Sequence, residues 1–133
     1  MADSPDMVLA LIALQDALGG TYGELSRPKL RLMVKLEKGP VNISELAERL
    51  RISSPAVSQM IDKLSLEGYV RRESWGGDQR IVAVALTDTG RVALKSALTA
   101  FRERIDQLLS PLTSDQIHHL GNLLEKALGT SRQ

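Results

Sequence analysis

The sequence lacks cysteine altogether, and it contains few aromatic residues and no long apolar run. Without cysteine the chain can form neither a disulfide framework nor a thiol redox switch. No segment approaches the ~18 consecutive apolar residues that a membrane-spanning helix needs. The apolar stretch 7–14 follows Asp3 and Asp6, where a secretory signal would carry basic residues. These absences predict a cytoplasmic protein with no membrane segment.

Strong net charge is absent too, since 17 Lys and Arg stand against 16 Asp and Glu. A net charge of +1 excludes the strongly basic balance of a non-specific nucleic-acid binder. The distribution is uneven, however. Residues 26–80 contain eleven basic and seven acidic residues, whereas residues 1–25 contain four acidic residues and no Lys or Arg. The basic surplus therefore lies in the segment that also carries the informative motifs.

Two capped helical patterns follow each other closely within this segment. Asn42 can cap the first one, and Glu45 stands at the capping-box position three residues later. Helical spacing gives this pattern one apolar face, made of Ile43, Leu46, Ala47 and Leu50. Residues 51–53 then form a short turn, which predicts a helix-turn-helix.

The second pattern starts at Ser53 or Ser54, either of which can cap it, and Pro55 fits its first turn. Its apolar face consists of Val57, Met60, Ile61 and Leu64. The outer face is mostly short and polar and holds Ser54, Pro55, Ser58, Gln59, Asp62 and Lys63. A helix that enters the major groove of DNA needs such a face, because its N-terminal residues reach the base edges. An ordinary solvated helix face is the alternative explanation.

Beyond Gly68, which can end this helix in a left-handed conformation, the sequence predicts a β-hairpin. One strand covers residues 69–72 and the other residues 80–86, with the loop 74–79 between them. Gly76 and Gly77 permit a tight reversal at its tip. The hairpin is therefore interpreted as the wing of a winged helix.

Two arginines of this hairpin are candidate DNA contacts. Arg72 and Arg80 lie near its base, where they can meet phosphates or enter a minor groove. Asp78 can pair with an arginine and fix its direction. For a hairpin taken alone, a routine surface ion pair would explain the same residues.

In this order, the motifs resemble the MarR family of bacterial winged-helix transcription regulators. The matching residues are Ser44–Leu50, Ser53–Ser58, Asp62–Leu64, Glu67–Val70, Arg72, Asp78, Arg80, Leu86, Thr87 and Gly90. The resemblance implies a mainly α fold with a small β-hairpin wing, in which N- and C-terminal dimerisation helices flank a winged helix-turn-helix. It also implies that the protein regulates transcription, as a repressor that binds DNA.

The resemblance implies roles for individual residues as well. Residues of the second helix are expected to contact the bases. In the wing, Arg80 is expected to contact DNA and Asp78 to support it. The complete set of candidate DNA-binding residues is Ser53, Ser54, Pro55, Ser58, Gln59, Lys63, Arg72, Asp78 and Arg80. The wing departs from the family pattern, because Glu73, Ser74 and Gln79 stand where relatives often carry basic residues, and Trp75 is unusual. We therefore expect weaker wing contacts than are typical of the family.

Apolar helical patterns also flank the winged helix. They cover residues 5–18, residues 26–37 after a Ser26 cap, residues 87–109 after a Thr87 cap, and residues 113–128 after a capping box of Thr113 and Gln116. In the second pattern, the residues expected to pack on the helix-turn-helix are Leu30, Met33, Val34 and Leu36. A winged helix of this size cannot cover all these apolar faces, so the surplus implies a partner surface.

In the resembled family, the first and last helices pair to form a two-fold dimer. We therefore expect one domain over residues 1–133, with the winged helix at 26–90 and dimerisation helices at 1–20 and 91–130. A homodimer places two reading helices on one face of double-stranded DNA, which predicts a pseudo-palindromic operator with half-sites ~10 bp apart. Many relatives also release DNA when a small molecule enters a cleft beside the dimer helices. By position, Tyr22, Arg31 and the stretch 7–14 could line such a site, and ordinary core and surface roles are the alternative.

Enzyme motifs are missing from the sequence. It has no Gly-rich phosphate loop, nucleophile elbow or metal-ligand cluster, so we expect neither catalysis nor a cofactor nor a metal. His118 and His119 are adjacent and point about 100° apart on a helix, so they form no metal pair. The competing function is a winged helix used for protein–protein interaction, with DNA binding weak or lost. The low net charge and the departures of the wing from the basic family pattern favour it, whereas Arg72, Asp78 and Arg80 together favour DNA.

Overall fold

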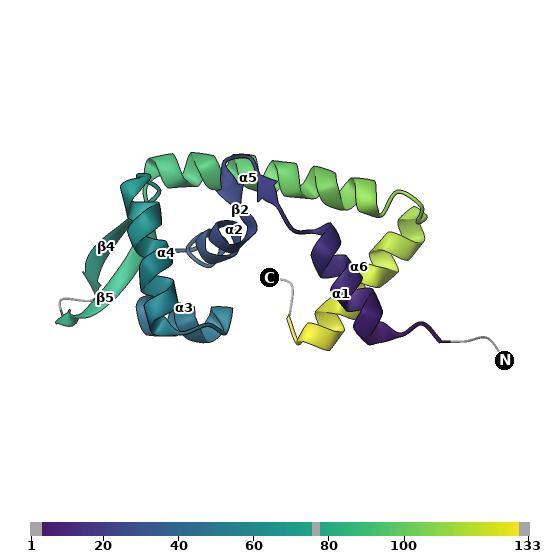
Figure 1. Cartoon of the computed structure of the whole chain (residues 1–133), viewed down its shortest axis with the longest axis horizontal. Coiled ribbons are helices and arrows are strands. Elements are labelled where there is room, and N and C mark those ends of the chain that lie inside the picture. Colours follow the sequence, from purple (N-terminus) through teal and green to yellow (C-terminus); the bar gives the residue numbers. More distant parts are fainter. Residues whose placement is uncertain (1–3, 76–77, 131–133) are drawn as a thin grey trace. The chain divides into compact units, whose positions relative to one another are not determined.

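The computed structural model of the chain describes residues 4–75 and 78–130, and for residues 75, 78 and 79 it describes the backbone alone. The chain divides into two compact units, Gly19–Phe101 and Met1–Leu18 with Arg102–Gln133. The helices of the described residues are α1 (Met7–Ala17), α2 (Arg27–Val34), α3 (Ile43–Leu50), α4 (Ser54–Leu66), α5 (Asp88–Leu108) and α6 (Ser114–Leu128). The strands are β1 (Thr21–Tyr22), β2 (Leu25–Ser26), β3 (Val41–Asn42), β4 (Val70–Trp75) and β5 (Asp78–Leu86). The predicted mainly α fold with a small β wing is confirmed (Figure 1).

The core of the unit Gly19–Phe101 collects the apolar faces that the helical spacing predicted. In α3 and α4 the buried side chains are Leu46, Ala47, Leu50, Val57, Ile61 and Leu64. Ile43 and Met60 are partly buried against the same cluster. Each fully buried aliphatic side chain contributes roughly 1.5–3 kcal/mol. Because one face of α4 is held in the core in this way, its opposite face must point outward.

The sheet of this unit is larger than a hairpin. Its strand order is β3-β5-β4, with Val41 opposite Val84 and Val70 opposite Leu86 in antiparallel register. The sequence did not indicate β3, because a strand of two residues is too short to show alternation. The wing strands are also longer than predicted. Most of the expected loop 74–79 is strand, and the tip at Gly76 and Gly77 lies outside the described residues.

Helix α2 begins after Ser26 as predicted, but it ends at Val34 rather than at Glu37. The Ser26 side chain makes no capping hydrogen bond, although the residue occupies the cap position. Residues 35–38 continue as a tighter turn with backbone bonds between residues three apart. The predicted core residues Leu30, Met33 and Leu36 are buried. Val34 is instead 36% exposed, and Leu32 takes a fully buried place in the core.

A close joint connects the end of α4 to the start of α5. Thr87 Oγ1 donates a hydrogen bond to Gly68 O (2.5 Å) and accepts one from the Gly90 N–H (3.0 Å). The Thr87 N–H also donates to Tyr69 O at 3.0 Å. At Gly90 the backbones approach so closely that a Cβ would lie 1.9 Å from Tyr69 O. Thr87 is therefore the predicted cap of α5, and Gly90 is required there for its lack of a side chain.

The unit of Met1–Leu18 and Arg102–Gln133 contains α1, α6 and the end of α5. Asp6 caps α1, and the predicted capping box of Thr113 and Gln116 is present at α6. Neither α1 nor α6 has a buried residue. Their large apolar side chains are exposed instead, among them Val8 (66%), Ile12 (49%) and Leu123 (50%). These two helices thus carry a large apolar surface that a single chain does not cover.

Candidate nucleic-acid interface

The residues predicted to read bases lie on the outward face of α4, near its N-terminus. The Ser53 hydroxyl oxygen accepts a hydrogen bond from the Ala56 N–H at 3.2 Å, so Ser53 rather than Ser54 is the cap. The exposed predicted residues of this helix are Ser54, Pro55, Gln59 and Lys63, and Ser58 is half-buried. The first two turns of α4 thus present short side chains and one amide, which allow a DNA backbone and base edges to come close.

The turn before α4 contains a non-glycine residue in the left-handed backbone conformation. Arg51 has φ 57° and ψ 42°, a left-handed conformation that it shares with no other non-glycine residue of the described chain. Glycine is the usual residue in this position, and a side chain there costs roughly 1–2 kcal/mol. The Ile52 N–H donates to Ala47 O at 3.1 Å and closes the end of α3. The sequence carries no glycine or asparagine signal here, so this conformation could not be predicted.

Arg72, a predicted phosphate contact, is held against α4. Its Nη2 lies 2.7 Å from Asp62 Oδ1 on the outward face of that helix. The two side chains are 38% and 63% exposed, so the pair itself contributes less than ~1 kcal/mol to stability. The pair offsets the negative charge of Asp62 on the outward face of α4 and occupies one edge of the Arg72 guanidinium. The sequence placed both residues near DNA but did not indicate that they are partners.

The neighbouring arginine of the wing is paired within its own strand. Arg71 Nε lies 3.3 Å from Glu73 Oε2, as residues two apart on one face of a strand can. Glu73 therefore offsets the charge of Arg71 on this side of the wing. The expected weak contact between the wing and DNA stays a prediction.

Arg80, the predicted wing contact, is exposed at the start of β5. It lines a cavity of about 410 Å³ together with Asn42, Ser44 and three apolar residues, which brings it next to the N-terminus of α3. Asn42 Oδ1 accepts a hydrogen bond from the Glu45 N–H at 2.8 Å, while the Glu45 carboxylate pairs with Arg49 rather than returning a capping-box bond. Helix N-termini attract anions, so this corner suits a phosphate. The Asp78 side chain lies outside the described residues. Ser44, which lines this cavity, was not among the predicted DNA-binding residues.

Two further contacts fasten the carboxyl end of α4 and the base of the wing. Lys29 Nζ donates to Glu67 Oε1 at 2.6 Å. Tyr69 Oη donates to Glu24 Oε2 at 2.9 Å. This hydrogen bond, together with burial and the negative charges of Glu24 and Glu67, raises the pKa of Tyr69 above its ordinary value of 10.0. These contacts hold the carboxyl end of α4 and the base of the wing to the rest of the unit.

A smaller cavity lies along α2, from Arg27 at its start to Lys35 just past its end. Its volume is about 220 Å³, and basic residues Arg27, Arg31 and Lys35 line it together with apolar ones that include Leu98 and Phe101. The Tyr22 ring packs on Phe101 with 4.8 Å between ring centroids. Arg31, a predicted wall residue of a ligand site, therefore lines a real cavity, and Tyr22 supports one wall of it.

Other kinds of site find little support in the described part of the chain. No group of three or more His, Cys, Asp or Glu residues is placed there to hold a metal ion, and both His118 and His119 are exposed on α6. None of the described helices has the length and apolar character needed to cross a membrane.

Comparison with known proteins gives consistent results. The sequence model of the MarR family matches residues 25–82. The homoprotocatechuate degradative operon repressor of Escherichia coli is 30% identical over 112 residues, which cover 82% of this chain and 76% of that protein. The repressor MdtR of Bacillus subtilis is 27% identical over 99 residues, which cover 74% of this chain and 64% of that protein. Among solved structures, a MarR mutant from E. coli complexed with operator DNA has a TM-score of 0.73 at 21% identity, covering 92% of this chain and 91% of that one.

Proposed function

This chain belongs to the MarR family of transcriptional regulators, and from that premise we propose that it is a cytoplasmic repressor that binds a specific DNA operator as a homodimer. Two of its relatives are named as repressors, and the fold is that of a MarR protein solved with operator DNA. The observation that carries the proposal is the outward face of α4, where Ser54, Pro55 and Gln59 are exposed beside the anchored Arg72. No enzymatic role is proposed.

Within this function, α4 enters the major groove and the wing follows the backbone. Gln59 can form two hydrogen bonds to an adenine, and Ser58 can bond to several bases. Arg72, Arg80 and Lys63 bind phosphates, and Arg80 does so next to the N-terminus of α3. Ser53 contributes by capping the helix that carries the readers. Residues 26–90 form the reading part of one MarR-like domain.

The exposed apolar side chains of α1 and α6 support a homodimer. Besides those named above, Met7, Leu9 and Leu11 of α1 are 63%, 63% and 48% exposed, and Leu124 and Leu128 of α6 are 43% and 73% exposed. Isolated exposed apolar residues are normal, but runs of them on adjoining turns of two helices are typical of an interaction surface. We therefore place dimerisation in residues 1–20 and 91–130. Two chains then present two reading helices to one face of the duplex.

A small-molecule effector belongs to the proposal. The cavity of Arg27, Arg31, Lys35 and Phe101 combines positive charge with an apolar floor, which suits an anionic compound with an aromatic or aliphatic body. Such a compound would release DNA only if it bound one spacing of the two reading helices more tightly than the other.

The function is tested by selecting binding sites from a random duplex library with the purified full-length protein at near-physiological salt. We expect enrichment of an inverted repeat with half-sites ~10 bp apart. Enrichment of a single half-site would contradict the dimer but keep the DNA reader. If no sequence is enriched and only weak, salt-sensitive binding remains, the winged helix serves protein–protein interaction instead.

A further inference from the structure

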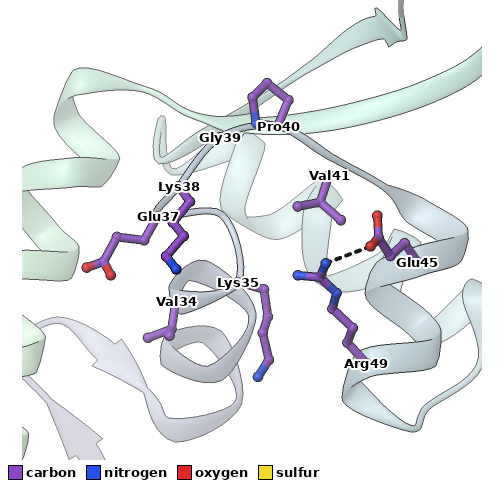
Figure 2. A pocket seen from close by; sticks show the side chains of 9 residues that line it. All are labelled: Val34, Lys35, Glu37, Lys38, Gly39, Pro40, Val41, Glu45 and Arg49. Atoms are coloured by element: carbon purple, nitrogen blue, oxygen red, sulfur yellow. Dashed lines mark hydrogen bonds and ion pairs between the residues drawn. The ribbon is translucent and has the colours of Figure 1, made fainter. Parts of the chain in front are cut away.

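A second basic cavity lies at the carboxyl end of α2 and shares no residue with the proposed DNA-binding set. Its volume is about 470 Å³, within the range of ~300–1,000 Å³ that small-molecule sites occupy. The walls are residues 34–35 and 37–41 at the end of α2 and the start of β3, with Glu45 and Arg49 of α3 opposite them (Figure 2). The cavity is thus built from two helices and a connecting segment of one compact unit.

Positive charge predominates in this cavity. Its lining includes the cations Lys35, Lys38 and Arg49 and the carboxylates Glu37 and Glu45, which leaves one positive charge uncompensated. Arg49 Nη2 is paired with Glu45 Oε1 at 2.6 Å. Within the described residues, neither lysine has an ion-pair partner, and Lys35 is half-buried. Figure 2 shows Arg49 reaching from α3 toward α2, while Glu37 points away from the other charged groups.

The cations come from different parts of the fold. Lys35 stands at the carboxyl end of α2, where a lysine is favoured in any helix. Lys38 follows in the connection, and Arg49 belongs to α3. Helix stability accounts for Lys35, and also for Arg49, which lies in the last turn of α3 and pairs with Glu45 four residues earlier. It does not account for Lys38, which lies in the connection and lines the same cavity.

The remaining walls are apolar and short. Val41 is 7% exposed, Val34 is 36% exposed, and Pro40 contributes a ring without a backbone N–H. Gly39 has φ +148°, which bends the connection so that these residues face the same space. A ligand with a single negative charge and a small aliphatic body matches this lining.

We propose that this cavity is a binding site for a small aliphatic carboxylate. It adjoins the cavity at Arg31, with which it shares Val34 and Lys35. The carboxylate accepts hydrogen bonds from Lys38 and from the free edge of the Arg49 guanidinium, because a guanidinium paired on one side still has donors on the other. Its alkyl chain covers Val34, Pro40 and Val41. A ligand bound to Arg49 contacts α3, and residues 51–53 connect α3 directly to the proposed DNA-reading helix α4.

The test is a titration of the full-length protein with butyrate at constant ionic strength, followed by backbone amide NMR. We expect saturable shifts at Gly39, Val41 and Arg49 with millimolar butyrate, and much smaller shifts with butyramide, its neutral analogue. Acetate, which lacks the longer chain, should bind more weakly than butyrate. Lys38→Gln should weaken the fitted Kd for butyrate about fivefold, because it removes one charge from the site.

Arg31→Gln is the matched control, since Arg31 lines only the smaller cavity and its variant should leave the butyrate shifts unchanged. Three results would overturn the proposal. The first is equal binding of butyramide and butyrate, and the second is a set of shifts that depends on Arg31 rather than on Lys38. The third is a loss of duplex affinity in Lys38→Gln without any butyrate binding, which would make Lys38 a DNA backbone contact.

Discussion

Asp62 Oδ1 accepts a hydrogen bond from Arg72 Nη2 at 2.7 Å, and this contact joins the reading helix α4 to the wing strand β4. An acidic residue on a DNA-facing helix repels phosphates, so its presence needs a counterpart. Arg72 is that counterpart in the free protein. In the proposed complex, DNA phosphates would compete with Asp62 for the Arg72 guanidinium, and Asp62 would reduce the contribution of this arginine to binding.

Asp62→Asn is expected to tighten binding to non-specific duplex DNA about fivefold, because it removes a negative charge and releases Arg72 to phosphates. Stability should change by less than ~1 kcal/mol, since both side chains are substantially exposed. Fluorescence anisotropy at several salt concentrations measures the affinity. Glu103→Gln, with the same charge change on α5, is the control and should have little effect. Weaker binding by Asp62→Asn would show that the pair instead positions Arg72 for DNA.

Arg80→Ala is expected to weaken operator binding and to lower the slope of log affinity against log salt by about one, because one phosphate contact is lost. The loss should be similar for all sequences, since phosphate contacts carry no base information. Arg102→Ala removes the same charge from α5 and should leave both quantities nearly unchanged. An unaltered salt slope in Arg80→Ala would contradict the role assigned to the wing.

Gln59→Ala is expected to relax base preference at one position of each half-site, at a cost of ~1–3 kcal/mol in discrimination there. The measurement is site selection with the variant under the same conditions as the wild type. Selection of the same sequence with the same stringency would show that Gln59 does not read a base.

Gly90→Ala is expected to lower the free energy of unfolding by about 1–3 kcal/mol, because the added Cβ would lie 1.9 Å from Tyr69 O and must displace backbone. The control is Gly121→Ala in α6, where a Cβ has no neighbour within 4 Å. That change should be neutral or stabilising by up to about 1 kcal/mol through helix propensity. Urea denaturation compares the two variants, and equal effects would refute the close approach at Gly90.

Tyr69→Phe tests the anchor at the base of the wing. The pKa of Tyr69 is raised in the folded state. The hydrogen bond to Glu24 therefore stabilises the fold fully below the unfolded-state pKa near 10, and this stabilisation is lost as the pH rises through the folded-state pKa. At pH 7 the variant should be about 1 kcal/mol less stable than the wild type. This difference should shrink in denaturation curves recorded above pH 10. A difference that stays constant up to pH 11 would mean that the hydroxyl is not bonded to the carboxylate.

Local signals in the sequence determined most of the helical architecture. Asn42, Thr87 and Thr113 each mark a helix start, and the structure confirms all three. For α4 the sequence offered Ser53 or Ser54, and the structure selects Ser53. A capping side chain bonds to a backbone group only two or three residues away, so the contact does not depend on the tertiary structure. Caps can therefore be predicted from the sequence. The apolar spacing of α3 and α4 likewise predicted their buried faces, and with them the outward position of Gln59.

Only the tertiary structure decided which distant side chains meet. The pairs of Asp62 with Arg72, Lys29 with Glu67 and Tyr69 with Glu24 join residues 10, 38 and 45 positions apart. Sequence periodicity fixes the face on which a residue lies but not the element that this face will oppose. The left-handed Arg51, the two-residue strand β3 and the choice of Leu32 over Val34 for the core have the same origin. In each case, packing of the whole unit overrides a weak local preference, because burial contributes more free energy than the local conformation costs.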